Sequence, residues 1–287
     1  IGDVLDKIEA QVYYNYADHV MDNYSLRTPS GTGMMSGPMA SNVDRRTLGA
    51  RIKATWHWAD YQLISGIDAQ TNEHRKRSGM GIDTYKDQNW SKDADFHNYG
   101  AFGELTWYAA ERDRVITGAR LDRAAAKDYR ARIGSGMMSK ANPTLDKTRA
   151  DTLPSGFVRY EHDLADSPAT VYAGLGHAER FPDYWELFSP TSGPAGSVNA
   201  FDAIKPEKTT QLDVGLQYKT RDLEAWVSAY AGVVHDYILF DYDSGSSRAQ
   251  NINARIMGGE LGAAYQLTAH WKADATLAYA WGKNTTD

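Results

Sequence analysis

The sequence predicts an all-β protein, an antiparallel transmembrane β-barrel, on three observations. Apolar and polar residues alternate with a period of two over long segments, which is the side-chain period of a β-strand and not of a helix. Aromatic residues make up 11% of the 287 residues, beside 25 glycines, although the mean hydropathy is only −0.57. Short and long connections alternate along the chain. Membrane barrels combine these features, because an apolar outer face girdled by aromatic residues encloses a polar lumen.

The composition argues against several other classes of protein. No apolar run approaches the length of about 20 residues that a transmembrane helix needs. The chain has no cysteine, which excludes disulfide scaffolds, cysteine-zinc sites and thiol nucleophiles. Its 31 basic and 37 acidic residues give a net charge of −6, which argues against a nucleic-acid partner. GxSxG, HExxH and P-loop patterns do not occur, so the sequence does not predict an enzyme.

The strand pattern is clearest near the C-terminus, where Trp271 to Trp281 alternate apolar residues with Lys272, Asp274 and Thr276. Several alternating segments exceed ten residues, whereas strands of a soluble β-sandwich, the alternative fold, average about five or six. The pattern therefore favours a barrel. It predicts eleven strands, at 8–21, 43–57, 60–76, 94–110, 113–130, 148–163, 168–181, 207–220, 222–241, 247–267 and 270–283.

The connections between these segments fall into two sets. Short turns lie at 57–60, 110–113, 163–167, 219–222 and 267–270. Longer connections rich in Gly, Ser, Pro and Met lie at 22–42, 77–93, 131–147, 182–206 and 242–246. Outer-membrane barrels have short periplasmic turns and longer external loops, so segment 8–21 is expected to run outward.

Eleven strands predict an incomplete barrel. Single-chain bacterial barrels have even strand numbers, and an unclosed sheet leaves two unpaired edges. At about 26 residues per strand with its connection, a plugged barrel of about 22 strands would need about 570 residues. Residues 1–287 are therefore expected to form one domain that supplies about half of such a barrel.

Three stretches carry a resemblance to a known family. The run ERFPDYWELF at 179–188, IKPEKTTQLDVGLQY at 204–218 and QNINARIMGGELGAAYQL at 250–267 resemble, in this order, segments of TonB-dependent outer-membrane receptors. The run HAERFPDYWELF, the segment YYNYADHVMDNY and the Met-rich connections are similar to sequences of the copper-receptor branch of this family. The resemblance extends over essentially the whole chain. It also implies that the N-terminal plug, the TonB box, the first strands and the closing strands lie outside this sequence.

The resemblance implies a function and a location. It implies a monomeric, multi-pass protein of the Gram-negative outer membrane, surrounded by lipid and lipopolysaccharide. Copper would bind on the external side, and the TonB complex would act through the plug to release it. One alternative is a TonB-dependent receptor for a siderophore or cobalamin complex, for which Arg180, Tyr184 and Trp185 would matter more than methionine. A passive porin or a surface adhesin is the second alternative.

His19 and Met21 are the first candidate metal ligands. They form an HVM triplet at the outer end of the first segment, and residues i and i+2 of a strand project from one face. The alternation places both with Gln11 and Tyr13, opposite the apolar stripe and hence in the lumen. A thioether beside an imidazole favours Cu(I), with Cu(II) as the alternative oxidation state. The copper-receptor branch carries an HxM element that pairs with a Cys and a Met of the plug, and His19 and Met21 match that element.

Methionines in the external connections are the second candidate site. Six of the eight fall in predicted loops, and two loops share a repeat, GTGMMS at 31–36 and GSGMMS at 134–139. Paired thioethers on such loops could capture Cu(I) and pass it inward; the other interpretation is that methionine is an adaptable filler where loops pack. His177, beside the ERFPDY corner, is a further candidate on the expectation that it faces the lumen. The candidate capture residues are Met34, Met35, Met39, Met137, Met138 and His177.

Overall fold

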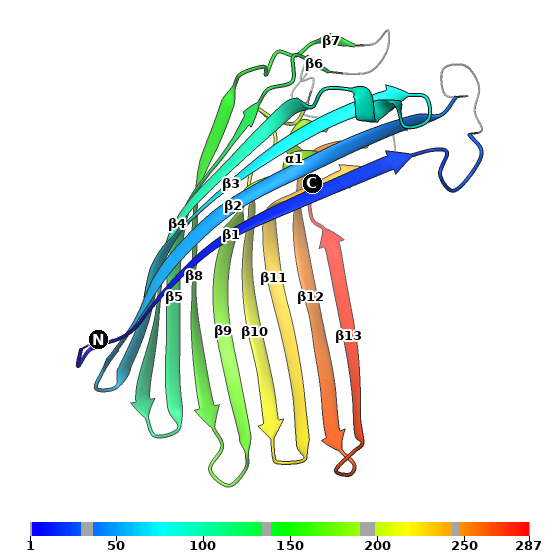
Figure 1. Ribbon diagram of the computed structural model, residues 1–287. Coiled ribbons are helices and arrows are strands. Elements are labelled where there is room, and N and C mark those ends of the chain that lie inside the picture. Colours follow the sequence, from blue (N-terminus) through cyan, green and yellow to red (C-terminus); the bar gives the residue numbers. More distant parts are fainter. Residues whose placement is uncertain (1, 30–36, 134–138, 190–198, 243–246, 287) are drawn as a thin grey trace.

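The computed structural model describes residues 2–29, 37–133, 139–189, 199–242 and 247–286. Within these ranges, eleven antiparallel strands form one sheet in which each strand pairs with the next along the chain, apart from a small hairpin, β6–β7, between β5 and β8. Figure 1 shows this sheet curving like the wall of a barrel. The prediction of an antiparallel barrel sheet of eleven strands is confirmed. The strands are β1 (Leu5–Asp22), β2 (Met39–Trp58), β3 (Tyr61–Met80), β4 (Ser91–Ala110), β5 (Asp113–Asp128), β6 (Arg132–Ile133), β7 (Lys140–Ala141), β8 (Thr148–Asp163), β9 (Ala169–Arg180), β10 (Glu207–Lys219), β11 (Leu223–Asp241), β12 (Arg248–Gln266) and β13 (Lys272–Asn284).

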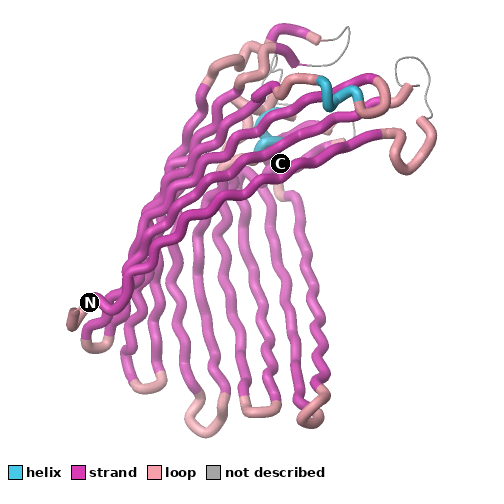
Figure 2. The backbone as a smooth tube through the Cα atoms, viewed as in Figure 1, coloured by secondary structure: helices cyan, strands magenta, loops and turns pink. Residues whose placement is uncertain are grey.

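The connections lie at two ends of the sheet, as Figure 2 shows. At one end, the short-turn end, tight turns join the strands; at the other, the long-connection end, lie a 3₁₀ turn, η2 (Thr84–Asp87), and a short helix, α1 (Tyr184–Phe188). The N-terminus lies at the short-turn end, so β1 runs toward the long connections. In the described part of the chain, no helix is both long and apolar enough to cross a membrane.

Strands β2 and β3 extend four residues beyond the predicted segments at the long-connection end. Met39 begins β2, Met80 ends β3, and the two are direct cross-strand partners. Met39 and Met80 are therefore strand residues, and their placement in loops was wrong. The strands continue because the backbone ladder depends on register and not on apolar alternation. The cross-strand pair of Asn42 with Arg77 supports the added length.

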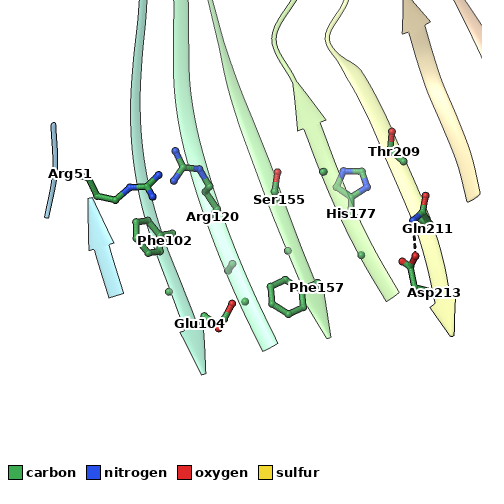
Figure 3. Close-up of a pocket in the computed structure, with 16 residues that line it drawn as sticks. Arg51, Phe102, Glu104, Arg120, Ser155, Phe157, His177, Thr209, Gln211 and Asp213 are labelled. Carbon is green, nitrogen blue, oxygen red and sulfur yellow. Dashed lines mark hydrogen bonds between the residues drawn. The ribbon is translucent and has the colours of Figure 1, made fainter. Parts of the chain in front are cut away.

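One face of the sheet, here called the polar face, carries a cross-strand chain of charges. The Arg120 guanidinium donates to both carboxylate oxygens of Asp68 at 2.8 Å, and its Nε donates to Asp122 at 2.6 Å. The Phe102 ring lies between Arg51 and Arg120, whose Cζ atoms are 5.6 and 5.7 Å from its centroid. Figure 3 shows Arg51, Phe102 and Arg120 together with Glu104 and Gln211. Because these charged side chains have partners of opposite sign, such a face is compatible with a water-filled barrel lumen.

The opposite face, here called the apolar face, carries exposed aliphatic and aromatic side chains. Val12 on β1 is 76% exposed, and its register partners on the next strands are Ala50 and Ala69, followed by Tyr99 on β4. Exposure of this much aliphatic surface is expected only where lipid covers it. The alternation predicted from the sequence thus separates the two faces along the strands.

The buried core lies at the long-connection end, where residues 181–189 and 199–206 fold back onto the sheet. Leu187 and Phe201 are fully buried against Ala126, Ile238 and Ala249. Two long connections are joined by polar contacts as well, because Asn199 donates to Thr144, which in turn donates to the buried Asp128 at 2.8 Å. This packing holds residues 181–189 and 199–206 in place against strands β4, β5 and β11.

The ERFPDYWELF corner is held by two carboxylates. Arg180, at the end of β9, donates to both oxygens of Glu186 at 2.8 and 2.7 Å, and its Nε donates to Glu207 at 2.6 Å. Asp183 and Glu186 form a capping box that starts α1. Pro182 ends the strand because it has no backbone N–H for the ladder. The corner residues therefore have a structural role, and this role links two of the stretches that carry the family resemblance.

Candidate functional site

His19 and Met21 lie on the polar face near the long-connection end of β1. Their cross-strand partners are Val43 and Ser41, in the register that places Gln11 opposite Arg51 lower on the same strands. Because successive side chains alternate between faces, both residues share the face of Arg51. The Met21 side chain is 44% exposed. This is the face predicted for the triplet from the sequence.

Two further methionines line the same cavity as Met21. Met80 is opposite Met39, and Met39 is two residues along β2 from Ser41, the partner of Met21. Directly opposite Cβ atoms on one face lie about 5 Å apart and diagonal neighbours about 7–8 Å apart, so Met39 is a neighbour of both Met21 and Met80. Met80, on β3, lies one strand further from Met21. The three methionines line a cavity of about 420 Å³ together with Asn23, Ser41 and Ser78.

The local backbone fixes the positions of these thioethers. The Asn23 side chain accepts a hydrogen bond from the Met39 N–H at 2.9 Å and donates to the Gly37 carbonyl at 3.2 Å. It thereby joins the end of β1 to the start of β2. On the other side, a Cβ atom at Gly79 would collide with the backbone of η2, so glycine is needed for the turn to pack against β3.

The three thioethers are soft and uncharged, and Asp22 is the charged residue among the side chains that line the cavity. Thioethers bind Cu(I) without losing a proton, and they bind Mg, Ca or Mn poorly. In the described ranges, no group of three or more His, Cys, Asp or Glu side chains is arranged to hold a metal ion. His19 is not among the residues that line the cavity but lies one pleat further along β1, below Met21.

The other sequence-predicted residues are not brought to this place. Met34, Met35, Met137 and Met138 lie outside the described residues. His177 is a strand residue of β9, paired with Thr210, and the register places it on the apolar face with Leu175 and Leu212. Its Nδ1 is 2.8 Å from the Thr210 hydroxyl. The expectation that His177 faces the lumen was therefore wrong, because register and not proximity to the corner decides the face.

Met80 is the site residue that reasoning from the sequence did not select. A signal for it was present: Met39 and Met80 are equally distant from the two-residue turn at Ala59 and Asp60, so a regular hairpin pairs them. The extended strands and the two-residue turn bring Met80 to Met39, and thus to the cavity that Met21 also lines.

Comparison with known proteins now identifies the class. Residues 3–287 match the family model described as TonB dependent receptor-like, beta-barrel, and the chain belongs to this family. Its members are receptors and transporters. A search of curated protein sequences finds no significant match.

Several solved structures resemble this chain. Over its whole length the chain is 67% identical to the copper transporter OprC, with a TM-score of 0.90 and coverage of 45% of that chain. The ferric-catecholate import receptor Fiu of E. coli K12 is 14% identical, with a TM-score of 0.65 and coverage of 100% of this chain and 46% of that one. The FrpB iron transporter of Neisseria meningitidis is 16% identical, with a TM-score of 0.66 and coverage of 98% of this chain and 42% of that one. The last two likenesses show the fold alone. The chain spans less than half the length of these proteins.

Proposed function

We propose that this chain is part of the barrel of a TonB-dependent transporter that imports copper across a Gram-negative outer membrane. The observation that carries the proposal is the grouping of Met21, Met39 and Met80 on one face, next to His19, in a chain 67% identical to a copper transporter. In this proposal the exposed aliphatic face contacts lipid and lipopolysaccharide. The TonB complex acts through a plug domain of the full-length protein, which functions as a monomer.

His19 and Met21 are proposed as the ligands that the barrel contributes to the bound ion. Cu(I) is the favoured state because imidazole and thioether are soft enough for it and thioethers bind the oxygen-preferring metals poorly. Met39 and Met80 are proposed to receive the ion first, since they lie nearer the long connections than Met21 does. Met34, Met35, Met137 and Met138 remain predicted capture residues.

Import of a siderophore or cobalamin complex is the alternative, and the low-identity neighbours include iron receptors. That alternative relies on Arg180, Tyr184 and Trp185 as ligand contacts. Tyr184 is buried and Trp185 is 58% exposed. The Arg180 side chain is 46% exposed, but its guanidinium is bound by two carboxylates. These contacts favour a structural role for the corner and weigh toward the copper proposal.

The direct test is metal analysis of the purified full-length protein. We expect it to retain copper after desalting when it is incubated with Cu(I), or with Cu(II) and a reductant, in the absence of any organic chelator. Retention of metal only as a ferric-siderophore or cobalamin complex would contradict the proposal. Conductance of planar bilayers containing the full-length protein, at the level of an open channel, would favour a passive porin instead.

Replacing Met39 and Met80 by leucine should weaken Cu(I) binding by about tenfold in the full-length protein, in the range seen when supporting groups of a metal site are removed. Leucine conserves side-chain volume and removes only the sulfur, so the strands are expected to pack unchanged. Competition with a coloured Cu(I) chelator measures the affinity. Met257→Leu, on the apolar face of β12, is the matched control and should have no effect.

A further inference from the structure

An apolar groove crosses the apolar face of strands β1 to β5. Ala50, Ala69 and Ala101 leave a hollow because larger register neighbours surround them. The groove has a volume of about 740 Å³, and its raised edges are Val12, Ile52, Ile67, Tyr99 and Leu121. A hollow floored by alanine and edged by branched side chains on a lipid-facing surface matches the cross-section of an acyl chain.

A second cavity lies directly beyond the groove, toward the long-connection end. Its first lining residues, Tyr14, Leu48, Thr71 and His97, are each the next apolar-face position along strands that line the groove. The cavity has a volume of about 390 Å³. The two hollows are therefore consecutive on the same four strands, the first apolar and the second polar.

The polar cavity is rich in charge. Arg46 and Lys92 line it together with Glu73 and Asp95. The Lys92 ammonium lies 3.2 Å from Glu73 and 2.6 Å from Asp95, whereas the Arg46 side chain is 44% exposed and its closest carboxylate, Asp44, is 3.6 Å away. Arg46 therefore has guanidinium N–H groups available to an incoming anion.

Two more side chains, Arg123 in the groove and His97 in the polar cavity, have unused hydrogen-bonding capacity. Arg123, which lines the groove on β5, donates to the Thr152 hydroxyl at 3.0 Å, and within the described residues it makes no ion pair. The Nδ1 atom of His97 is buried, with no hydrogen-bond partner in the same part of the chain. A cation without a counter-ion and an orphaned ring nitrogen, both beside a lipid-facing groove, favour an anionic ligand with oxygen acceptors.

We infer that this surface binds one phosphorylated glycolipid of the outer leaflet, with an acyl chain in the groove and phosphate groups against Arg46, Lys92 and Arg123. The inference rests on the outer-membrane location proposed above. The outer leaflet is specified because the polar cavity lies toward the long connections. A glycolipid with more than one phosphate is specified because the cations are distributed over β2, β4 and β5 and one anion would not reach all three.

The test measures lipid binding to the delipidated full-length protein by native mass spectrometry. The probes are diphosphorylated lipid A, its dephosphorylated form and phosphatidylglycerol. Replacing Arg46, Lys92 and Arg123 by glutamine should weaken lipid A binding by about a hundredfold, from the usual contribution of each basic residue near a membrane surface. The matched control replaces Lys219, Arg221 and Lys272, which are exposed at the short-turn end, and should bind lipid A like the unaltered protein.

A second variant addresses the groove without changing any charge. Ala69→Phe fills the hollow from the lipid-facing side and should also reduce lipid A binding, while phosphatidylglycerol and dephosphorylated lipid A should bind the unaltered protein weakly. Equal binding of lipid A to the unaltered protein and the triple variant would overturn the inference. Tight binding of phosphatidylglycerol would overturn the assignment to a glycolipid. Copper retention measured on the same samples separates the two proposals, since the triple variant should keep its copper.

Discussion

Full-length protein in which His19 and Met21 are both replaced by alanine is expected to lose its copper. The two side chains project from one face of β1 at adjacent pleats, so the double change removes an imidazole and a thioether from the same site. We expect Cu(I) affinity to fall by at least about a hundredfold, beyond the 10- to 100-fold loss typical when a group that only supports a ligand is removed. Metal content after desalting and chelator competition both measure the change.

The matched control for this variant replaces a histidine and a methionine that lie elsewhere. His57 is near the short-turn end, and Met257 is on the apolar face of β12. The double change His57→Ala with Met257→Ala should leave copper content unchanged. Equal copper occupancy in the His19/Met21 variant and in the unaltered protein would contradict the assignment of these two residues as ligands.

Replacing Asp93 by alanine should release α1 from the sheet. Asp93 is 1% exposed and accepts a hydrogen bond from the Tyr184 hydroxyl at 2.5 Å, while its other oxygen is 2.5 Å from His74 Nδ1. The His74 and Tyr184 rings are stacked, with centroids 3.8 Å apart. Removal of the carboxylate leaves two buried polar groups without a partner, at a cost of about 1–3 kcal/mol each. We therefore expect the free energy of opening of α1 to fall by about 3 kcal/mol.

Hydrogen exchange of the Leu187 and Ser189 amides measures this opening, because both donate to carbonyls within the α1 turn. Asp202→Ala is the control: Asp202 forms an exposed ion pair with Lys147 in the same region and should cost less than about 1 kcal/mol. Unchanged exchange at Leu187 in the Asp93 variant would show that the buried contacts do not hold α1.

The Tyr184 contact also predicts how the docking of α1 depends on pH. Burial, followed by the Asp93 charge, raises the pKa of the Tyr184 phenol above its ordinary value of 10.0. The neutral phenol is therefore the form favoured when α1 is docked. This contribution is fully present below pH 10 and is lost only as the pH rises through the alkaline range.

The sequence was sufficient to predict the number and order of the strands of the large sheet, but not where each strand ends. Alternation located all eleven strands and separated Val12 from Tyr13, because the two-residue period is a local property of extended backbone. It did not locate residues 39–42 of β2 and 77–80 of β3, where a polar pair, Asn42 and Arg77, replaces the apolar stripe. There the strand is maintained by this cross-strand pair, which is not visible in either strand alone.

Taken by itself, the sequence determined the fold class, the family resemblance and the common face of His19 and Met21, since each depends on residues close together in the chain. Only the tertiary structure decided which distant residues join them. Met80 lines the same cavity as Met21 because the hairpin register pairs it with Met39, and the register likewise places His177 on the opposite face. The joining of Arg180 to Glu207 and the cations beside the alanine-floored groove likewise depend on pairing across several strands, which turn lengths and long-range packing set together.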